Sequence, residues 1–248
     1  MKRKEFLKSL GMSSIVLPLI VGCSEEEINP INEDNASETT GSTTSSNNTD
    51  SCAITPSETE GPFPTKNPSS LERIDIRGDR TGIELSLEIA ILNLNDSCAP
   101  IEGAIVDIWH CDKDGNYSEY GGTQMQSTNF TSVHFLRGRQ VTDSNGLVKF
   151  TTIFPGWYQS RATHIHVHVY NSSGSSLLVT QIAFPEGNDS AVEAVNAASD
   201  QGYTKGMNGY TYNANDNVFS DGVEEELSTI TGSVDEGYEL SHSIVVSA

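Results

Sequence analysis

Two histidines and a tyrosine in one short segment are the residues of this chain best suited to chemistry. His164 and His166 stand two positions apart in a strand-like run, so their side chains point to the same face of a strand. Ile165 and Val167 point the other way and are expected to pack in the core. Imidazole is a common ligand of transition metals. Tyr158 lies just before this run, and because phenolate is a strong oxygen donor, the pattern indicates a site for ferric iron.

A second tyrosine, Tyr117, follows an Asp-Gly turn just after a predicted strand that ends at His110. With it, the candidate ligands are two phenolates and two imidazoles. A free phenol has a pKa of about 10, so the metal must remove its proton, as metals do for bound water and thiols. No cysteine or carboxylate belongs to this set. That composition weighs against a thiolate zinc site and against a ferrous site of two histidines and one carboxylate.

The elements that must hold these side chains are mostly short strands. Apolar and polar residues alternate from Ile83 to Ile91, which is typical of a strand with one buried face. Turn signals such as Asp-Gly, Asn-Gly and Pro-Gly separate further strand-like runs. Many short strands with turns between them predict an all-β fold, an antiparallel β-sandwich with few short helices. The other predicted strands cover residues 103–110, 147–153, 164–170, 177–184, 227–233 and 238–246, and one predicted helix covers 190–198.

The start of the chain has the features of a bacterial export signal. Residues 1–22 combine a basic start with an apolar run that is too short to span a bilayer. The run ends directly before Cys23 in a sequence that resembles a lipoprotein cleavage box, which predicts that Cys23 becomes a lipidated first residue. An ordinary secretory signal with a chance cysteine is the alternative. The export route, general or twin-arginine, stays open.

A predicted linker separates this signal from the folded part. Residues 23–51 begin with an acidic run and continue rich in Ser, Thr and Asn, with almost nothing apolar to bury. The acidic run resembles a surface-export tag of some Gram-negative lipoproteins, and a simple solvated spacer is the alternative. The chain is therefore expected to be exported and lipid-anchored to a bacterial membrane, with the outer membrane or cell surface as candidate places. Residues 52–248 suit a single domain.

Charge and cysteine content narrow the partners and the compartment. The formal net charge of −20 argues against nucleic acid and against a polybasic membrane contact, so the lipid on Cys23 would be the only tether. In an exported protein, two of the remaining cysteines can pair. Cys98 and Cys111 flank a predicted strand that would hold them about 25 Å or more apart, beyond disulfide reach. Cys52 is therefore expected to pair with one of these two.

Four segments together resemble the intradiol ring-cleavage dioxygenases, the family of the catechol and protocatechuate dioxygenases. The resemblance covers most of the folded chain, roughly from Cys52 to Phe219. The segments are Thr-Glu-Gly-Pro-Phe at 59–63, Asp-Ile-Trp-His-Cys-Asp-Lys-Asp-Gly-Asn-Tyr-Ser at 107–118, Phe-Leu-Arg-Gly-Arg-Gln-Val-Thr-Asp at 135–143 and Phe-Pro-Gly-Trp-Tyr-Gln-Ser-Arg-Ala-Thr-His-Ile-His at 154–166.

The resemblance implies a β-sandwich that holds non-haem Fe(III) with two tyrosines and two histidines. The implied ligands in this chain are Tyr117, Tyr158, His164 and His166. Arg161 matches the active-site arginine of the family, and Gln181 matches a polar residue near the substrate. The resemblance also implies that a bound catechol displaces one tyrosinate, Tyr158, which can take a substrate proton, and that Arg161 stabilises developing negative charge.

The sequence thus predicts an oxidoreductase that uses dioxygen to cleave a catechol-type ring between its two hydroxyl-bearing carbons, giving a muconate-type diacid. Only two residues separate Tyr158 from Arg161, fewer than in the subunit-type enzymes, and this short form looks like an exported branch of the family. One alternative is a cell-surface binding module of the same fold without turnover. Another is a zinc or copper hydrolase that uses the histidine row, which His168 extends. The catechol substituent and the oligomeric state stay open.

Overall fold

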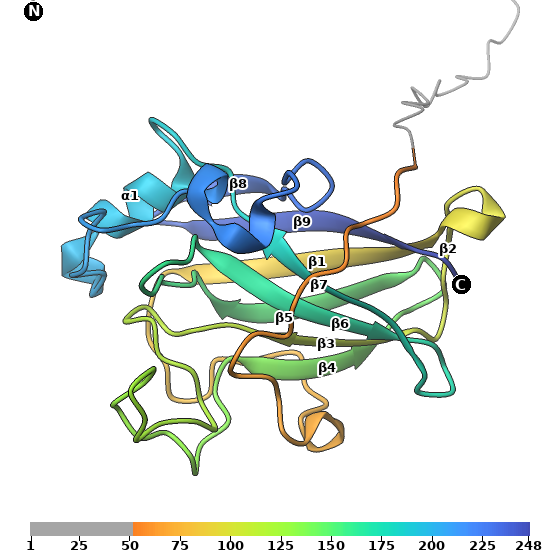
Figure 1. Ribbon diagram of the computed structural model, residues 1–248, viewed down its shortest axis with the longest axis horizontal. Helices are drawn as coiled ribbons and strands as arrows, with labels where there is room; N and C mark the ends of the chain where they lie inside the picture. Colours follow the sequence, from red (N-terminus) through yellow and green to blue (C-terminus); the bar gives the residue numbers. More distant parts are fainter. Residues whose placement is uncertain (1–51) are drawn as a thin grey trace, which may run out of the picture. The chain divides into compact units, whose positions relative to one another are not determined.

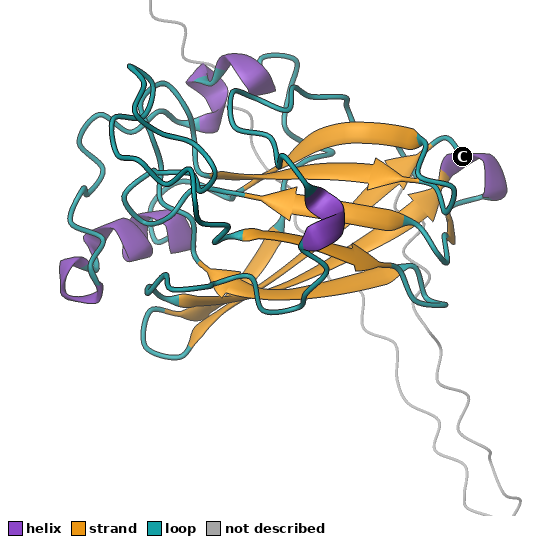
Figure 2. Ribbon diagram, turned by 90° about the horizontal axis from the view of Figure 1, so that it is seen from below, coloured by secondary structure: helices purple, strands orange, loops and turns teal. Residues whose placement is uncertain are grey.

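The computed structural model describes residues 52–248, and these fold as a sandwich of two β-sheets with few short helices (Figures 1 and 2). One sheet has the order β2-β1-β9-β8, with β5 also paired to β1, and the other has the order β4-β3-β6-β7. The predicted fold class is confirmed. The predicted signal, linker and Cys23 lie outside the described residues.

The elements follow one another in chain order, with a long connection over residues 110–136. The strands are β1 (Glu84–Asn93), β2 (Ala99–Pro100), β3 (Ile105–Trp109), β4 (Arg137–Val141), β5 (Leu147–Ile153), β6 (His164–Tyr170), β7 (Ser176–Ala183), β8 (Thr229–Ser233) and β9 (Gly237–Val246). The α-helix is α1 (Ala191–Ala197), and the 3-10 helices are η1 (Pro68–Ser70), η2 (Leu94–Asp96), η3 (Ser199–Gln201), η4 (Asn213–Asn215) and η5 (Asn217–Phe219).

Every strand and the helix predicted from periodicity is confirmed, and two strands were missed. β2 pairs over only two residues, too few for a period. β4 reads Arg-Gly-Arg-Gln-Val, which lacks alternation, and its pairing with β3 makes it a strand. One pairing departs from the antiparallel expectation, because β9 runs parallel to β1 along nine residue pairs. β5 pairs with one edge of β1, and β9, which forms a hairpin with β8, pairs with the other edge.

The core lies between the two sheets. One face of β6 lines this core, and its other face lies on the outer side of its sheet. The alternate residues Leu85, Leu87 and Ile89 of β1 are at most 2% exposed. They share one apolar cluster with Ile165 and Val167 of β6, which are fully buried as expected. Because side chains alternate along a strand, His164 and His166 must point away from this core. In Figure 1 the orange segment that follows residue 52 crosses in front of the sheet β4-β3-β6-β7, the second sheet.

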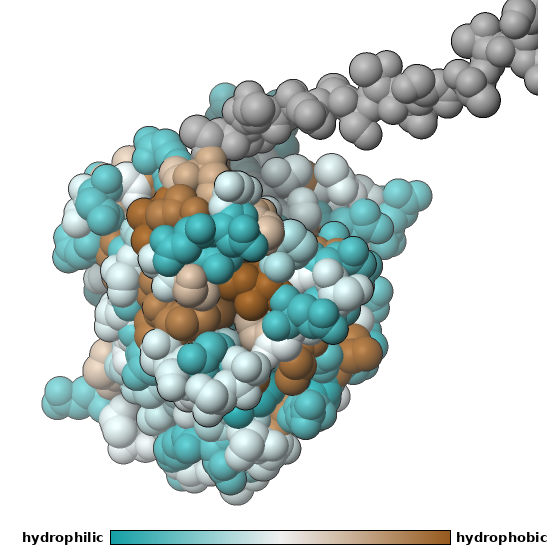
Figure 3. All heavy atoms as spheres, turned by 90° about the vertical axis from the view of Figure 1, so that its right-hand side faces the viewer, coloured by the Kyte–Doolittle hydropathy of each residue, from teal (hydrophilic) through white to brown (hydrophobic). Residues whose placement is uncertain are grey.

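Apolar side chains on the surface are dispersed. Figure 3 shows apolar surface broken into small patches by hydrophilic side chains on the face it draws. Isolated exposed apolar residues are normal for folded proteins. Between residues 52 and 248, no helix is long and apolar enough to cross a membrane. The large apolar side chains with the most exposure are Met125, Ile74, Ile54 and Val141.

A disulfide joins Cys52 to Cys98, with Cα atoms 6.1 Å apart. This agrees with the expectation that Cys52 pairs with one of two candidates, and it leaves Cys111 as a buried free thiol. The bridge fastens the start of the described chain to the turn after β1. Such cross-links act chiefly by restricting the unfolded chain, more so for longer loops.

Removal of this bridge should destabilise the fold. The two cysteines are 46 positions apart, and loop-closure entropy for that length corresponds to about 4 kcal/mol. We expect Cys98→Ser to lower the free energy of unfolding by about that amount, measured by urea denaturation. Dithiothreitol should have the same effect on the wild type and none on the variant. A further loss in the reduced variant would contradict the assigned pairing.

Candidate metal centre

The two histidines of β6 lie in the middle of the second sheet, between β3 and β7. His166 stands opposite Trp109 on β3 and opposite Gln181 on β7. The Trp109 ring stacks on the His166 ring with centroids 5.0 Å apart and planes within 1°. Both His164 and His166 are at most 2% exposed although they point away from the core, so other segments must cover them.

The two tyrosines reach the histidines from loops that follow β3 and β5. The Tyr117 hydroxyl lies 3.2 Å from His164 Nε2, and its side chain is fully buried. The Tyr158 ring meets Tyr117 edge-on at 5.7 Å and His164 at 5.6 Å between centroids. His164 and His166 approach each other with their Nε2 atoms 3.2 Å apart. The structure therefore brings together all four side chains that the sequence selected as candidate ligands.

Residues 59–63 form one cover over this cluster. Gly61 lies directly on His166: a Cβ atom on Gly61 would come within 3.0 Å of His166 Cε1, and its φ of +67° is one that side chains rarely adopt. Phe63 stacks on the Tyr117 ring at 4.9 Å. The Thr59 carbonyl accepts a hydrogen bond of 2.8 Å from Gln181 Nε2. This cover explains why Thr-Glu-Gly-Pro-Phe occurs near the start of the domain.

Burial keeps the four groups uncharged in the absence of a cation. Desolvation, followed by the positive charge of Arg161, lowers the pKa of His164 well below its ordinary value. Desolvation, followed by charge on His164, does the same for the pKa of His166. Burial likewise raises the pKa of both tyrosines, Tyr117 the more strongly. The histidines are therefore ready to act as neutral ligands, while the phenols need a strong cation to lose their protons.

The tautomer of His164 is fixed by the backbone. Its Nδ1 lies 2.6 Å from the Ala162 carbonyl, and because a carbonyl only accepts, Nδ1 carries the proton and Nε2 keeps its lone pair. That lone pair faces Nε2 of His166 and the Tyr117 hydroxyl. His166 Nδ1 is buried and makes no hydrogen bond of ordinary geometry.

These donors fit a metal ion. Bonds of about 2.1 Å to one metal place neighbouring ligand atoms about 3 Å apart. His164 Nε2 lies 3.2 Å from both His166 Nε2 and the Tyr117 oxygen. Among residues 52–248, no group of three or more His, Cys, Asp and Glu side chains could hold a metal. A metal at this place would therefore depend on the phenols, which favours a strongly acidic ion such as Fe(III).

Arg161 lies beside the four donors, and Gln181 lies next to Arg161. Arg161 NH1 is 3.4 Å from the Tyr158 hydroxyl and 3.3 Å from His164 Nε2, and its NH2 donates to Gln181 Oε1. Burial alone would lower the pKa of Arg161, but Tyr158, in its phenolate form, and the Asp216 carboxylate raise it. The guanidinium is thus a fixed positive charge next to the candidate metal position.

Four further histidines lie outside the cluster: His242 of β9, and three whose side chains have clear partners. His168 stacks on Tyr170 at 3.9 Å and lies 3.2 Å from a Glu60 oxygen. His110 is held by the Cys111 carbonyl and the Thr152 hydroxyl, and desolvation lowers its pKa to about 4. His134 is exposed and pairs with Glu119. These contacts explain the three rings without a metal.

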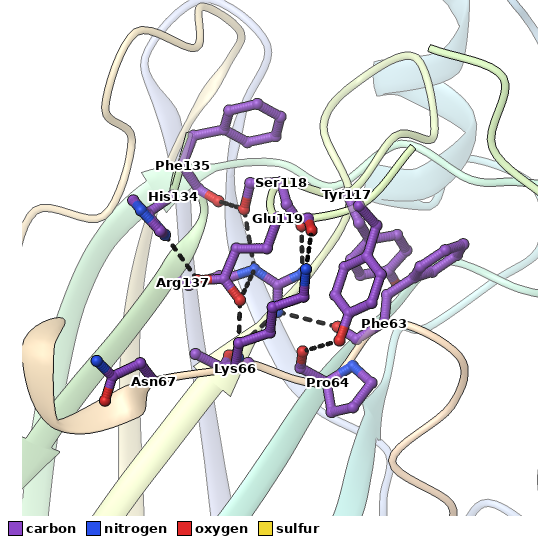
Figure 4. A network of polar contacts seen from close by, with 12 residues as sticks. Phe63, Pro64, Lys66, Asn67, Tyr117, Ser118, Glu119, His134, Phe135 and Arg137 are labelled. Carbon is purple, nitrogen blue, oxygen red and sulfur yellow. Dashed lines mark hydrogen bonds and ion pairs between the residues drawn. The ribbon is translucent and has the colours of Figure 1, made fainter. Parts of the chain in front are cut away.

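A buried arginine that the sequence left without a role, Arg137 of β4, holds the Tyr117 loop (Figure 4). Arg137 is 1% exposed. Its guanidinium donates to the Ser118 hydroxyl at 2.9 Å, to the Ser118 carbonyl at 2.6 Å and to the Phe63 carbonyl at 2.9 Å. It therefore fastens both the residue after Tyr117 and the aromatic ring that stacks on Tyr117. An arginine at the start of a polar run, Arg-Gly-Arg-Gln at 137–140, is the one sequence signal that could have indicated this role.

Glu119 completes the same network from the other side. Its carboxylate accepts from the Lys66 backbone N–H at 2.7 Å and from His134 Nδ1 at 2.7 Å, and it lies 3.7 Å from Arg137. Figure 4 shows the Lys66, His134 and Arg137 side chains gathered around it. The buried charges are thus paired and hydrogen-bonded, which is the condition for tolerating them.

Comparisons with known proteins agree with this geometry. A family model described as Dioxygenase matches residues 63–208. Chlorocatechol 1,2-dioxygenase of Rhodococcus opacus is 30% identical over 143 residues, which are 50% of this chain and 51% of that protein. The chain thus spans about half the length of this curated relative. The matched residues include all four candidate ligands: Tyr117, Tyr158, His164 and His166.

Two solved structures show the same fold. An intradiol ring-cleavage dioxygenase from Tetranychus urticae superposes with a TM-score of 0.69 at 28% identity, covering 79% of this chain and 95% of that chain. The dioxygenase domain of a carbohydrate-binding fusion protein from Streptomyces sp. SirexAA-E superposes with a TM-score of 0.55 at 23% identity, covering 79% and 99%. The second likeness concerns the fold alone.

Substitution of Arg137 tests whether this network holds the tyrosine loop. Arg137→Lys keeps the charge but leaves several buried acceptors without a donor, so we expect a loss of about 2–4 kcal/mol in the free energy of unfolding. Arg77→Lys is the control, because the Arg77 side chain is 36% exposed and a lysine can still pair with Asp75 or Glu84, and it should cost at most about 1 kcal/mol. Urea denaturation measures both. Equal losses would contradict a special role for Arg137.

Proposed function

This chain belongs to the intradiol ring-cleavage dioxygenase family, and on that premise we propose that it is a non-haem ferric dioxygenase that cleaves catechol-type rings between the two hydroxyl-bearing carbons. The observation that carries the proposal is the convergence of two phenols and two neutral imidazoles on one buried point. Relatives of this family include a chlorocatechol 1,2-dioxygenase. The product would be a muconate-type diacid.

Tyr117, Tyr158, His164 and His166 would hold the iron. When bound, Fe(III) supplies a Lewis acid that acidifies the catechol hydroxyls and draws electron density from the ring. A strongly acidic ion is required because burial raises the pKa of both phenols. The two neutral imidazoles complete the donor set without adding charge.

Tyr158 is the tyrosine placed to exchange with the substrate. It is partly exposed while Tyr117 is fully buried, so a catechol can reach its oxygen first. As a phenolate, Tyr158 can take a proton from the incoming catechol and so act as a general base. The Arg161 guanidinium, 3.4 Å away, stabilises the Tyr158 phenolate before this exchange.

Arg161 also supplies the positive charge for the developing anion of the substrate. Preorganised donors of this kind act strongly in a site that excludes water. Gln181 holds the guanidinium from one side and connects it to Thr59 in the cover. Trp109 stacked on His166 and Phe63 stacked on Tyr117 keep water from the ligand side.

The test is metal loading followed by catechol turnover. Wild-type protein with one equivalent of Fe(III) should absorb in the visible through tyrosinate-to-iron charge transfer and should consume dioxygen with catechol. We expect Tyr158→Phe to shift and weaken this band and to lower kcat about 10²-fold or more. Tyr170→Phe is the matched control, because Tyr170 packs on His168 outside the cluster, and should leave both unchanged.

The outcomes separate the alternatives. If the iron-loaded protein is coloured but takes up no dioxygen with any catechol of a panel, the alternative of a surface binding module of the same fold is favoured. A colourless protein that prefers zinc or copper, insensitive to Tyr158→Phe, would leave a hydrolase built on the histidines. Metal analysis of the purified protein decides the second case.

We further propose that the protein is exported and lipid-anchored through Cys23. The disulfide between Cys52 and Cys98 supports an oxidising compartment. In cells fed a radioactive fatty acid, the wild type should become labelled and Cys23→Ala should not, with Cys111→Ala as a labelled control. Equal labelling of wild type and Cys23→Ala, or none in either, would refute the lipid anchor.

A further inference from the structure

A loop beyond the family match contacts the candidate metal centre. The match ends at residue 208, and the loop that carries η4 and η5 follows it. Asp216 stands between these two short helices. Its side chain is completely buried, and it faces Arg161. No sequence motif singled out this aspartate.

The Asp216 carboxylate accepts hydrogen bonds from the Arg161 side chain and from two backbone N–H groups. Arg161 Nε lies 3.0 Å from Oδ1 and 2.8 Å from Oδ2. The Ala162 backbone N–H donates to Oδ2 at 2.8 Å and the Val218 N–H donates to Oδ1 at 3.0 Å. A carboxylate with both oxygens used in this way is held in one orientation.

The contact with Ala162 extends the reach of Asp216 to a candidate metal ligand. The N–H of Ala162 is fixed by Asp216, and the carbonyl of the same residue accepts the proton of His164 Nδ1 at 2.6 Å. One carboxylate thus sets the Arg161 guanidinium directly and, across a single residue, the tautomer and direction of the His164 ring. Partners of this kind, which orient a ligand from behind, commonly tune metal affinity and activity.

The loop itself is fastened to the segment it positions. The Tyr210 hydroxyl accepts from the Thr163 N–H at 3.0 Å and donates to Glu186 at 2.6 Å. The other oxygen of Glu186 accepts from the Asn213 N–H at 2.8 Å. Successive backbone N–H groups of Ala162 and Thr163 are therefore both held by side chains from the same loop.

From these contacts we propose that Asp216 is a positioning residue of this enzyme, which aligns Arg161 with Tyr158 and, through Ala162, His164 with the metal. The proposal rests on the proposed function and adds a residue outside the matched region. It predicts that Asp216 affects the reaction through Arg161 and His164, and that its loss leaves the four ligands in place. A carboxylate that only stabilised the fold would affect unfolding without affecting the site.

The principal test compares Asp216→Asn with Asp221→Asn, an exposed aspartate in the same loop. Iron content should stay near one per chain in both. We expect Asp216→Asn to lower kcat about 10²-fold, with a much smaller change in KM, and to shift the tyrosinate-to-iron band, because the charge beside Tyr158 moves. Asp221→Asn should match the wild type in all three. An unchanged kcat and band in a folded Asp216→Asn would overturn the proposal.

A double variant shows whether Asp216 acts through Arg161. If it does, the double variant Arg161→Met, Asp216→Asn should lose less kcat than the product of the two single losses, because residues that act as one unit are not additive. Any loss beyond that of Arg161→Met alone then measures the route through His164. Multiplicative losses would overturn the proposed route. Should Asp216→Asn fail to fold, Asp216→Glu keeps the ion pair but displaces the carboxylate by one methylene. It should fold and still lower kcat about tenfold or more, and full activity would again overturn the proposal.

One measurement separates this proposal from the proposed function. With diamagnetic Ga(III) in place of Fe(III), the Nε proton of Arg161, bonded to a buried carboxylate, should give a downfield, slowly exchanging signal in the nuclear magnetic resonance spectrum of the wild type. This signal should disappear in Asp216→Asn and persist in Asp221→Asn, whether or not the protein turns over catechol. If the wild type shows the signal but consumes no dioxygen, the dioxygenase proposal fails and the alignment of Arg161 stands. If Asp216→Asn retains the signal, the alignment fails.

Discussion

The two-residue period of β6 is the constraint on which the site depends. His164 and His166 can share one point only because Ile165 and Val167 are committed to the core on the other face. The face that carries the histidines belongs to an outer side of the sandwich, which would ordinarily be solvated. Covering it buries polar rings, and burying polar groups is costly unless each is satisfied. The need to cover these rings and to satisfy their polar atoms explains why loops and buried polar side chains surround β6.

Two buried charged networks satisfy that requirement from opposite sides. Arg137 and Glu119 fasten the loop of Tyr117 and the cover that carries Phe63. Asp216 fastens the turn that leads into β6 and the guanidinium of Arg161. Buried ion pairs of this type add little net stability in comparison with apolar packing. Their value here lies in orientation, because each fixes a backbone group next to a candidate ligand.

Periodicity predicted the strands and placed His164 and His166 on one face, but it could not predict the residues that support them. The alternation from Ile83 to Ile91 and the spacing of His164 and His166 are local signals, and the structure confirms both strands. β4 carries no period, since Arg137 is buried in a hydrogen-bond network and not in an apolar core. Asp216 lies 55 positions from its partner Arg161, and no local pattern joins two residues so far apart.

The short connection between Tyr158 and Arg161 follows from the same geometry. Ser160 has a φ of +71°, and the Arg161 N–H donates to the Tyr158 carbonyl at 3.1 Å, so the chain reverses within a single tight turn. The turn places the Tyr158 hydroxyl and the guanidinium on the same side, within 3.4 Å of each other. A turn this small has no residues of its own to hold the arginine in place. The carboxylate of Asp216 supplies that anchor from a distant loop, which is why a compact site requires the chain beyond its recognised core.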